Sequence, residues 1–171
     1  MSPYEQGELD GLCGVYSIIN AVKIVNEFSN EECKDIFHKI IRYLDSERNL
    51  SKLIINGLDI NLIGQVMNNI KDLQVQKEQP FKGKPGISLG EFWEKMKSFL
   101  SETNRAILLG LAGYHDHWTV VQSISNKQIN LLDSDGLMKL NRSSCTTQNP
   151  DKKRKHIISP THTYFLSSAL P

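Results

Sequence analysis

Features that direct a protein to a membrane or to nucleic acid are missing from this sequence. No apolar run is long enough to span a bilayer, and residues 1–6 hold no basic segment followed by an apolar core. The formal net charge is only +1, which gives no global preference for a polyanion or a membrane surface. We therefore expect a cytoplasmic protein without a nucleic-acid or membrane partner. The basic run at 152–155 (KKRK) is then a solvated loop, the alternative being a local polyanion-binding or nuclear-targeting segment.

Cysteine is also scarce. The chain has three cysteines, Cys13, Cys33 and Cys145, which lie far apart and without CxxC spacing. This arrangement argues against a disulfide framework and against a zinc knuckle. The histidines and cysteines show no metal-ligand spacing, so the sequence implies neither a metal nor an organic cofactor. All three thiols are expected to be free.

The composition that remains is that of a globular protein. Of 171 residues, 39% are hydrophobic and 23% are charged, and no internal repeat or low-complexity segment interrupts them. A chain of this length can enclose a sizeable core, and nothing in it marks a boundary between domains. Residues 1–171 are predicted to form a single domain.

The first part of the chain has the apolar spacing of helices. Ser29 and Ser88 each begin a Ser-x-x-Glu capping box, and Asp59 can cap a helix of its own. Together with the helix that starts at Cys13, these signals predict helices over about 13–26, 31–44, 60–70 and 89–100. Residues 45–49 are expected to form a loop, and 73–76 a short strand.

From residue 105 onward the pattern changes to short β segments. Residues 106–111, 117–124 and 128–133 are rich in aliphatic and β-branched side chains, and a turn at 126–127 joins the last two into an antiparallel hairpin. Residues 137–140 and 162–166 are expected to add strands. The sequence therefore predicts an α+β fold, with an N-terminal helical part followed by an antiparallel sheet.

Cys13 opens the first buried helix. Unpaired backbone N–H groups and the helix dipole favour an anion at that position, which suits a thiolate nucleophile. The alternative is an inert core cysteine, because free cysteines are among the most buried residues. Gln6 precedes Cys13 in a polar segment, where its amide could join the Cys13 backbone N–H in stabilising an oxyanion. The alternative for Gln6 is a solvated loop residue.

A cysteine nucleophile needs a base, and the base needs an acceptor that fixes its tautomer. His117 heads the central β segment and Asp133 ends the next one, so a hairpin brings the two ends together. Their side chains share a face only if an odd loop or a bulge corrects the register. His115 and Asp135 are the local competitors. We favour His117 and Asp133 because they belong to rigid elements and because Trp118 can shield the pair from water.

The segments that carry these residues resemble those of papain-like cysteine peptidases. The catalytic-cysteine helix of that superfamily is similar to GLCGVYSIINAV, and its His and Asp/Asn hairpin is similar to HWTVV followed by INLLDSDG. In length and layout the chain looks like the C39-like peptidases and, more distantly, the Josephin deubiquitinases. The resemblance implies a papain-like fold in which Cys13 is the nucleophile, His117 its base, Asp133 the orienting residue and Gln6 the oxyanion donor.

The same residues can serve several reactions through one thioester intermediate. A peptidase or isopeptidase resolves the thioester with water, whereas transglutaminases, deamidases and acyltransferases differ in the group that leaves or in the amine that accepts the acyl group. Our first hypothesis is a cysteine hydrolase that acts on a protein or peptide. The alternatives are acyl transfer or deamidation on the same fold, and a non-catalytic protein-binding module.

Overall fold

The computed structural model describes residues 1–7, 10–47 and 50–169. In these residues the helices are α1 (Cys13–Asn26), α2 (Asn30–Glu47), α3 (Leu50–Asn56), α4 (Ile60–Asn69) and α5 (Leu89–Phe99), with 3-10 turns at Lys71–Leu73 and Arg142–Ser144. The strands are β1 (Val75–Glu78), β2 (Arg105–Gly113), β3 (His117–Ile124), β4 (Gln128–Leu131), β5 (Lys139–Asn141), β6 (Cys145–Thr146) and β7 (His156–Ser168). No helix in the described ranges combines the length and apolar character needed to cross a membrane.

The strands form one sheet in the order β1-β7-β2-β3-β4-β5, with the short β6 paired to β7. All pairs are antiparallel except β6 with β7. The predicted α+β class is therefore confirmed, and β3 and β4 form the expected hairpin. The last strand differs from the prediction: β7 begins at His156 and lies inside the sheet, between β1 and β2.

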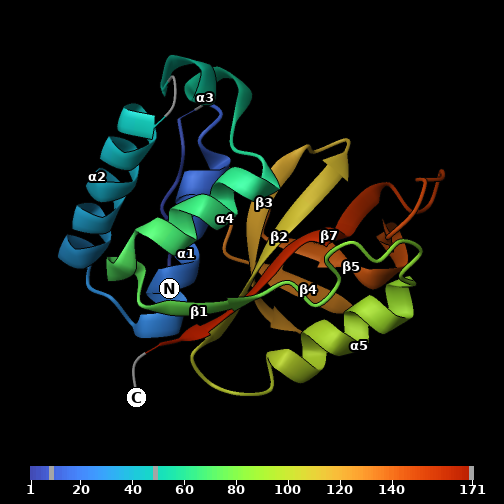
Figure 1. The fold of residues 1–171 in the computed structure, drawn as a ribbon. Helices are drawn as coiled ribbons and strands as arrows, with labels where there is room; N and C mark the ends of the chain where they lie inside the picture. Colours follow the sequence, from blue (N-terminus) through green and yellow to red (C-terminus); the bar gives the residue numbers. More distant parts are fainter. Residues whose placement is uncertain (8–9, 48–49, 170–171) are drawn as a thin grey trace.

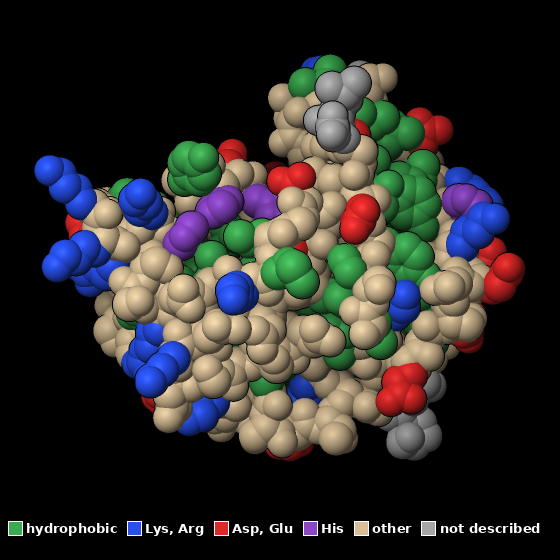
Figure 2. Space-filling model, turned by 180° about the vertical axis from the view of Figure 1, so that it is seen from behind, with side chains coloured by type: hydrophobic (Ala, Val, Ile, Leu, Met, Phe, Trp, Pro, Cys, Tyr) green, Lys and Arg blue, Asp and Glu red, His purple; other side chains and the backbone are tan. Residues whose placement is uncertain are grey.

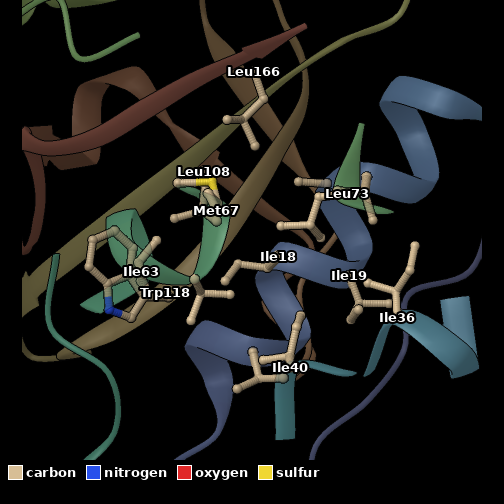
Figure 3. Close-up of a cluster of buried hydrophobic side chains, with 14 of the residues drawn as sticks. Ile18, Ile19, Ile36, Ile40, Ile63, Met67, Leu73, Leu108, Trp118 and Leu166 are labelled. Carbon is tan, nitrogen blue, oxygen red and sulfur yellow. The ribbon is translucent and has the colours of Figure 1, made fainter. Parts of the chain in front are cut away.

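Helices cover both faces of this sheet (Figure 1). Successive side chains of a strand point to opposite faces, and β2 divides its apolar residues accordingly. Ala106 and Leu108 pack into the cluster formed with α1, α2 and α4, while Ile107 and Leu109 pack into the cluster formed with α5. Figure 3 shows the first cluster, where isoleucines of α1 and α2 meet Ile63 and Trp118. The central strands are thus buried on both faces.

Local sequence signals account for most helix starts. Ser29 and Glu32 form the predicted capping box, with the Ser29 N–H 2.8 Å from Glu32 Oε2 and the Glu32 N–H 3.3 Å from Ser29 Oγ. Ser88 and Asp59 cap α5 and α4 by accepting backbone N–H groups. The predicted loop at 45–49 is wrong for residues 45–47, because α2 continues to Glu47, and residues 48 and 49 lie outside the described residues.

Candidate active site

Cys13 is the first residue of α1 and is half-buried. No side chain caps this helix at Leu12, so the N–H groups of its first turn are not consumed by a cap. The loop before it is held by Asp10 instead, whose two carboxylate oxygens accept the N–H groups of Leu12 (3.0 Å) and Gly7 (2.9 Å). Among the described residues, the Val15 and Tyr16 N–H groups donate to Leu12 O (2.8 and 3.1 Å), which leaves the N–H groups of Cys13 and Gly14 beside the thiol.

Two glycines bring the α3–α4 connection against this loop. The Gly11 N–H donates to Ile54 O at 2.6 Å. A Cβ at Gly11 would lie 2.9 Å from Ile54 O and 3.0 Å from Gly57 N, so only glycine fits there. Gly57 has a φ of +75°, a backbone conformation that glycine adopts at no steric cost. This close approach of two backbones places residues 56–60 next to Cys13.

Trp118 ties α1, β3 and the α3–α4 connection together. Its carbonyl accepts a hydrogen bond from Ser17 Oγ at 2.8 Å, and its indole N–H donates to Leu58 O at 2.8 Å; both bonds are buried. Gly14 leaves room for this packing, since a Cβ there would lie 3.1 Å from Leu58 Cβ. Because His117 directly precedes Trp118, the Ser17 bond sets the position of His117 relative to the start of α1.

His117 and Asp133 form a buried pair. His117 Nε2 lies 2.8 Å from Asp133 Oδ2, and their side chains are 10% and 1% exposed. Burial alone would lower the pKa of His117, but the hydrogen bond to Asp133, the neighbouring Cys13 thiol and the charges of both groups raise it to about 10. Since Nε2 is engaged by Asp133, Nδ1 is the ring nitrogen left for the thiol. His117 thus lies between an acceptor and a nucleophile.

Asp133 is fixed on its other oxygen by the turn that follows it. Asp133 Oδ1 accepts the N–H groups of Asp135 (2.9 Å) and Leu137 (3.0 Å). Burial would raise the pKa of Asp133, but His117, Thr119 and the Leu137 N–H hold it below its ordinary value. The Thr119 hydroxyl oxygen is buried and makes no hydrogen bond within the described part of the chain. The carboxylate is therefore kept ionised and oriented.

A bulge in the β3–β4 hairpin lets these side chains meet. Val121 pairs with Leu131 and Ser123 pairs with Asn130, which leaves Gln122 as an extra residue in β3. Without it, Asp133 would fall on the opposite face from His117. Pairing continues past the bulge, where the Leu132 N–H donates to Val120 O at 2.9 Å. The register correction that the sequence analysis required is present.

The competing residues have other partners. His115 Nε2 lies 2.8 Å from His156 Nδ1, and the two rings stack with centroids 5.0 Å apart. Burial, followed by the neighbouring His156, lowers the pKa of His115. Asp135 is exposed and contributes its backbone N–H to Asp133. The geometry joins Cys13, His117 and Asp133 and leaves the other two outside.

Gln6 lies next to this group of residues through its neighbour Ser134. The Gln6 N–H donates to Ser134 O at 3.0 Å, and Gln6 Oε1 lies 3.4 Å from Ser134 Oγ. Since Ser134 directly follows Asp133, the N-terminal segment runs beside the Asp133 turn. The role of the Gln6 amide as an oxyanion donor stays a prediction.

A cleft of about 360 Å³ opens at Cys13 and His117. Its walls come from four segments of the described chain: 56–60, 110–112, 116–118 and the pair Ser159 and His162. Figure 2 shows histidine side chains in a row on this side of the molecule, with acidic side chains close by. The cleft is large enough for a short stretch of polypeptide beside the thiol.

His162 was not predicted as a site residue, but it lines the cleft from a bulge in β7. Leu109 pairs with Thr163 and Gly110 pairs with Ser159, so residues 160–162 lie outside the β2–β7 ladder. A Cβ at Gly110 would lie 2.9 Å from His162 Cβ, so glycine is required opposite the bulge. Only pairing between distant strands creates this feature, and no local pattern marks it.

Comparison with known proteins adds no relative. No protein-family model matches the chain, and no curated protein matches its sequence. Among the described residues, no group of three or more His, Cys, Asp or Glu side chains is arranged to hold a metal ion. Function must therefore be argued from the side-chain geometry of this site.

Proposed function

We propose that the protein is a cysteine hydrolase that cleaves peptide or isopeptide bonds through a thioester intermediate. The observation that carries the proposal is His117, held by Asp133 at 2.8 Å and lining the same open cleft as Cys13. A nucleophile, a base and an orienting carboxylate in this order are the parts that acyl transfer requires. The papain-like resemblance of the two sequence segments supports the same assignment.

The first step is attack of the Cys13 thiolate on the carbonyl carbon of the substrate. Protonated His117 stabilises the thiolate, and the charge that develops on the carbonyl oxygen faces the unpaired N–H groups at the start of α1. The C–N bond then breaks as His117 gives its proton to the leaving amine. The acyl group remains on sulfur as a thioester.

The second step is hydrolysis of the thioester. His117, now neutral, takes a proton from water as the water oxygen attacks the acyl carbon. The C–S bond breaks, the carboxylic acid leaves, and Cys13 and His117 return to their starting states. Asp133 stabilises the imidazolium in both steps and keeps Nδ1 directed at the sulfur.

The test is a product analysis on a mixture of peptides in ¹⁸O-labelled water. The proposal predicts fragments with ¹⁸O in the new carboxyl group, formed by the wild-type protein and absent with Cys13→Ala. Cys33→Ala and Cys145→Ala are matched controls because both thiols are buried, and they should cleave as the parent does. Intact peptides in which ammonia has been exchanged for water or for an amine, with no fragments, would replace hydrolysis with deamidation or acyl transfer.

A further inference from the structure

Two segments of the cleft each carry an exposed carboxylate and, a few residues before it, an exposed apolar side chain. Asp59 lies in the α3–α4 connection and Ile55 near the end of α3, and Asp116 and Tyr114 lie in the β2–β3 turn. The two carboxylates line the cleft, and the two apolar residues are next to it in sequence. Ile55 is 77% exposed and Tyr114 is 87% exposed. The described residues contain only two other exposed large hydrophobic side chains, Met1 and Met138. Exposed apolar side chains thus gather near the cleft.

The charge of the cleft walls is one-sided. Asp59 and Asp116 line it, whereas none of the lining residues is Lys or Arg. In the described part of the chain neither carboxylate takes part in a salt bridge. Low-dielectric walls that carry one sign of charge concentrate ligands of the opposite sign. A cation that enters the cleft therefore meets two carboxylates without a salt-bridge partner, while the imidazolium of His117 is already paired with Asp133.

The Asp59 carboxylate is held by a helix cap, and Asp116 lies in a turn of left-handed backbone. Asp59 Oδ1 accepts the Leu62 N–H at 2.8 Å as the cap of α4, which fixes the side chain and leaves the second oxygen for a ligand. Asp116 adopts a left-handed backbone with φ of +43° in a turn where Gly113 has φ of +73°. This turn places Asp116, the residue directly before His117, in the wall of the cleft.

We propose, on the basis of the hydrolase function above, that the cleft selects a polypeptide with a lysine or arginine side chain close to the bond attacked by Cys13. The cationic head pairs with Asp59 and Asp116, and the aliphatic stem lies against Ile55 or Tyr114. Long basic side chains bind in this way, with the stem on apolar surface and the charge at its edge. An acidic side chain at the same position is repelled by both carboxylates.

The electrostatic potential in the cleft can be measured without a substrate. Methanethiosulfonates that carry a trimethylammonium or a sulfonate group react with the Cys13 thiolate, which forms a mixed disulfide and releases methanesulfinate. The rate with the trimethylammonium reagent divided by the rate with the sulfonate reagent should fall about fivefold in Asp59→Asn and in Asp116→Asn. Asn caps helices and tolerates a left-handed backbone, so both variants keep the fold. Asp35→Asn removes an exposed carboxylate of α2 and should leave the ratio within about twofold. Unchanged ratios in both cleft variants overturn the proposal.

Peptide cleavage then tests the recognition itself. Synthetic peptides carry lysine, norleucine or glutamate at each position in turn around one amide bond. The proposal predicts a preference for lysine over norleucine of about tenfold at one position, which Asp59→Asn or Asp116→Asn reduces. If norleucine peptides are cleaved as fast as lysine peptides, and Cys13→Ala abolishes both reactions, the preference for a basic side chain is refuted and the proposed hydrolase activity stands. If the two reagents show the predicted charge preference but no peptide is cleaved, the hydrolase activity is refuted and the attraction of cations to the cleft stands.

Discussion

His117 Nε2 lies 2.8 Å from Asp133 Oδ2, and this bond leaves Nδ1 as the ring nitrogen available to the Cys13 thiol. The pKa of His117 is raised to about 10 and that of Asp133 is lowered, so both shifts favour an imidazolium next to a carboxylate. An imidazolium beside a thiol favours the thiolate. Asp133 thus holds the imidazolium of His117 in the cleft that Cys13 also lines, as the proposed hydrolase requires.

The stability of the fold should depend on this pair in a defined pH range. A histidine whose pKa is raised from about 6.5 to about 10 adds stability that is fully present below pH 6.5 and is lost as the pH rises toward 10. The contribution of Asp133 is present above its ordinary pKa and is lost in acid. Asp133→Asn should therefore lower the free energy of unfolding by about 3 kcal/mol near pH 6, and by much less near pH 10.

Urea denaturation of the parent and Asp133→Asn at several pH values between 5 and 10 measures this difference. Asp135→Asn changes a nearby exposed carboxylate whose side chain has no bond to His117, and it should shift stability by less than about 0.5 kcal/mol at every pH. A difference between parent and Asp133→Asn that stays constant from pH 6 to pH 10 would show that His117 is not the charged partner.

Ser17→Ala should loosen the contact between α1 and β3. The substitution leaves the Trp118 carbonyl without its buried donor, at a cost of about 2 kcal/mol in unfolding free energy. Ser46→Ala is the matched control, because Ser46 also donates to a backbone carbonyl but on the exposed surface of α2. Thermal or urea unfolding checks both variants. Equal and small losses would mean that the Ser17 bond does not hold the two elements together.

Gly11→Ala should disturb the wall of the cleft. A Cβ at this position meets the Ile54 carbonyl and the Gly57 nitrogen, and backbone atoms cannot move aside as a flexible side chain can. We expect a loss of about 2 kcal/mol in unfolding free energy and slower alkylation of Cys13. At Gly90 in α5 the nearest atoms are 3.8 Å or more away, so Gly90→Ala should be neutral or slightly stabilising. Identical effects of the two substitutions would contradict the close approach at Gly11.

Those parts of the fold that depend on neighbouring residues could be predicted from the sequence. The start of α1 at Cys13, the caps at Ser29, Asp59 and Ser88, and the β3–β4 hairpin all follow from short patterns. Helix α3 could not be predicted, because its seven residues include none that is fully buried. Its inward apolar residues, Leu50, Leu53 and Ile54, are at helical spacing, but a run of about two turns is too short to give a clear periodic signal.

Features of the site that arise from distant strands were only partly predictable. His117 and Asp133 were selected by their positions at the ends of a hairpin, but only the bulge at Gln122 decides that they share a face. His162 enters the cleft because β7 bulges where it passes Gly110, and β7 is far from β2 in sequence. Such register shifts depend on pairing across the whole sheet, which one sequence does not encode in a motif.

The measurement that tests the central claim most directly is the rate of Cys13 alkylation by iodoacetamide as a function of pH, in the parent and in His117→Ala. Mass spectrometry assigns the label to Cys13 and not to the buried Cys33 and Cys145. The account predicts that the parent still reacts well below about pH 8.5, where ordinary thiols lose reactivity, and that His117→Ala is about tenfold or more slower at pH 6. Matching pH profiles for the two proteins would contradict a Cys13–His117 ion pair and, with it, the proposed hydrolase.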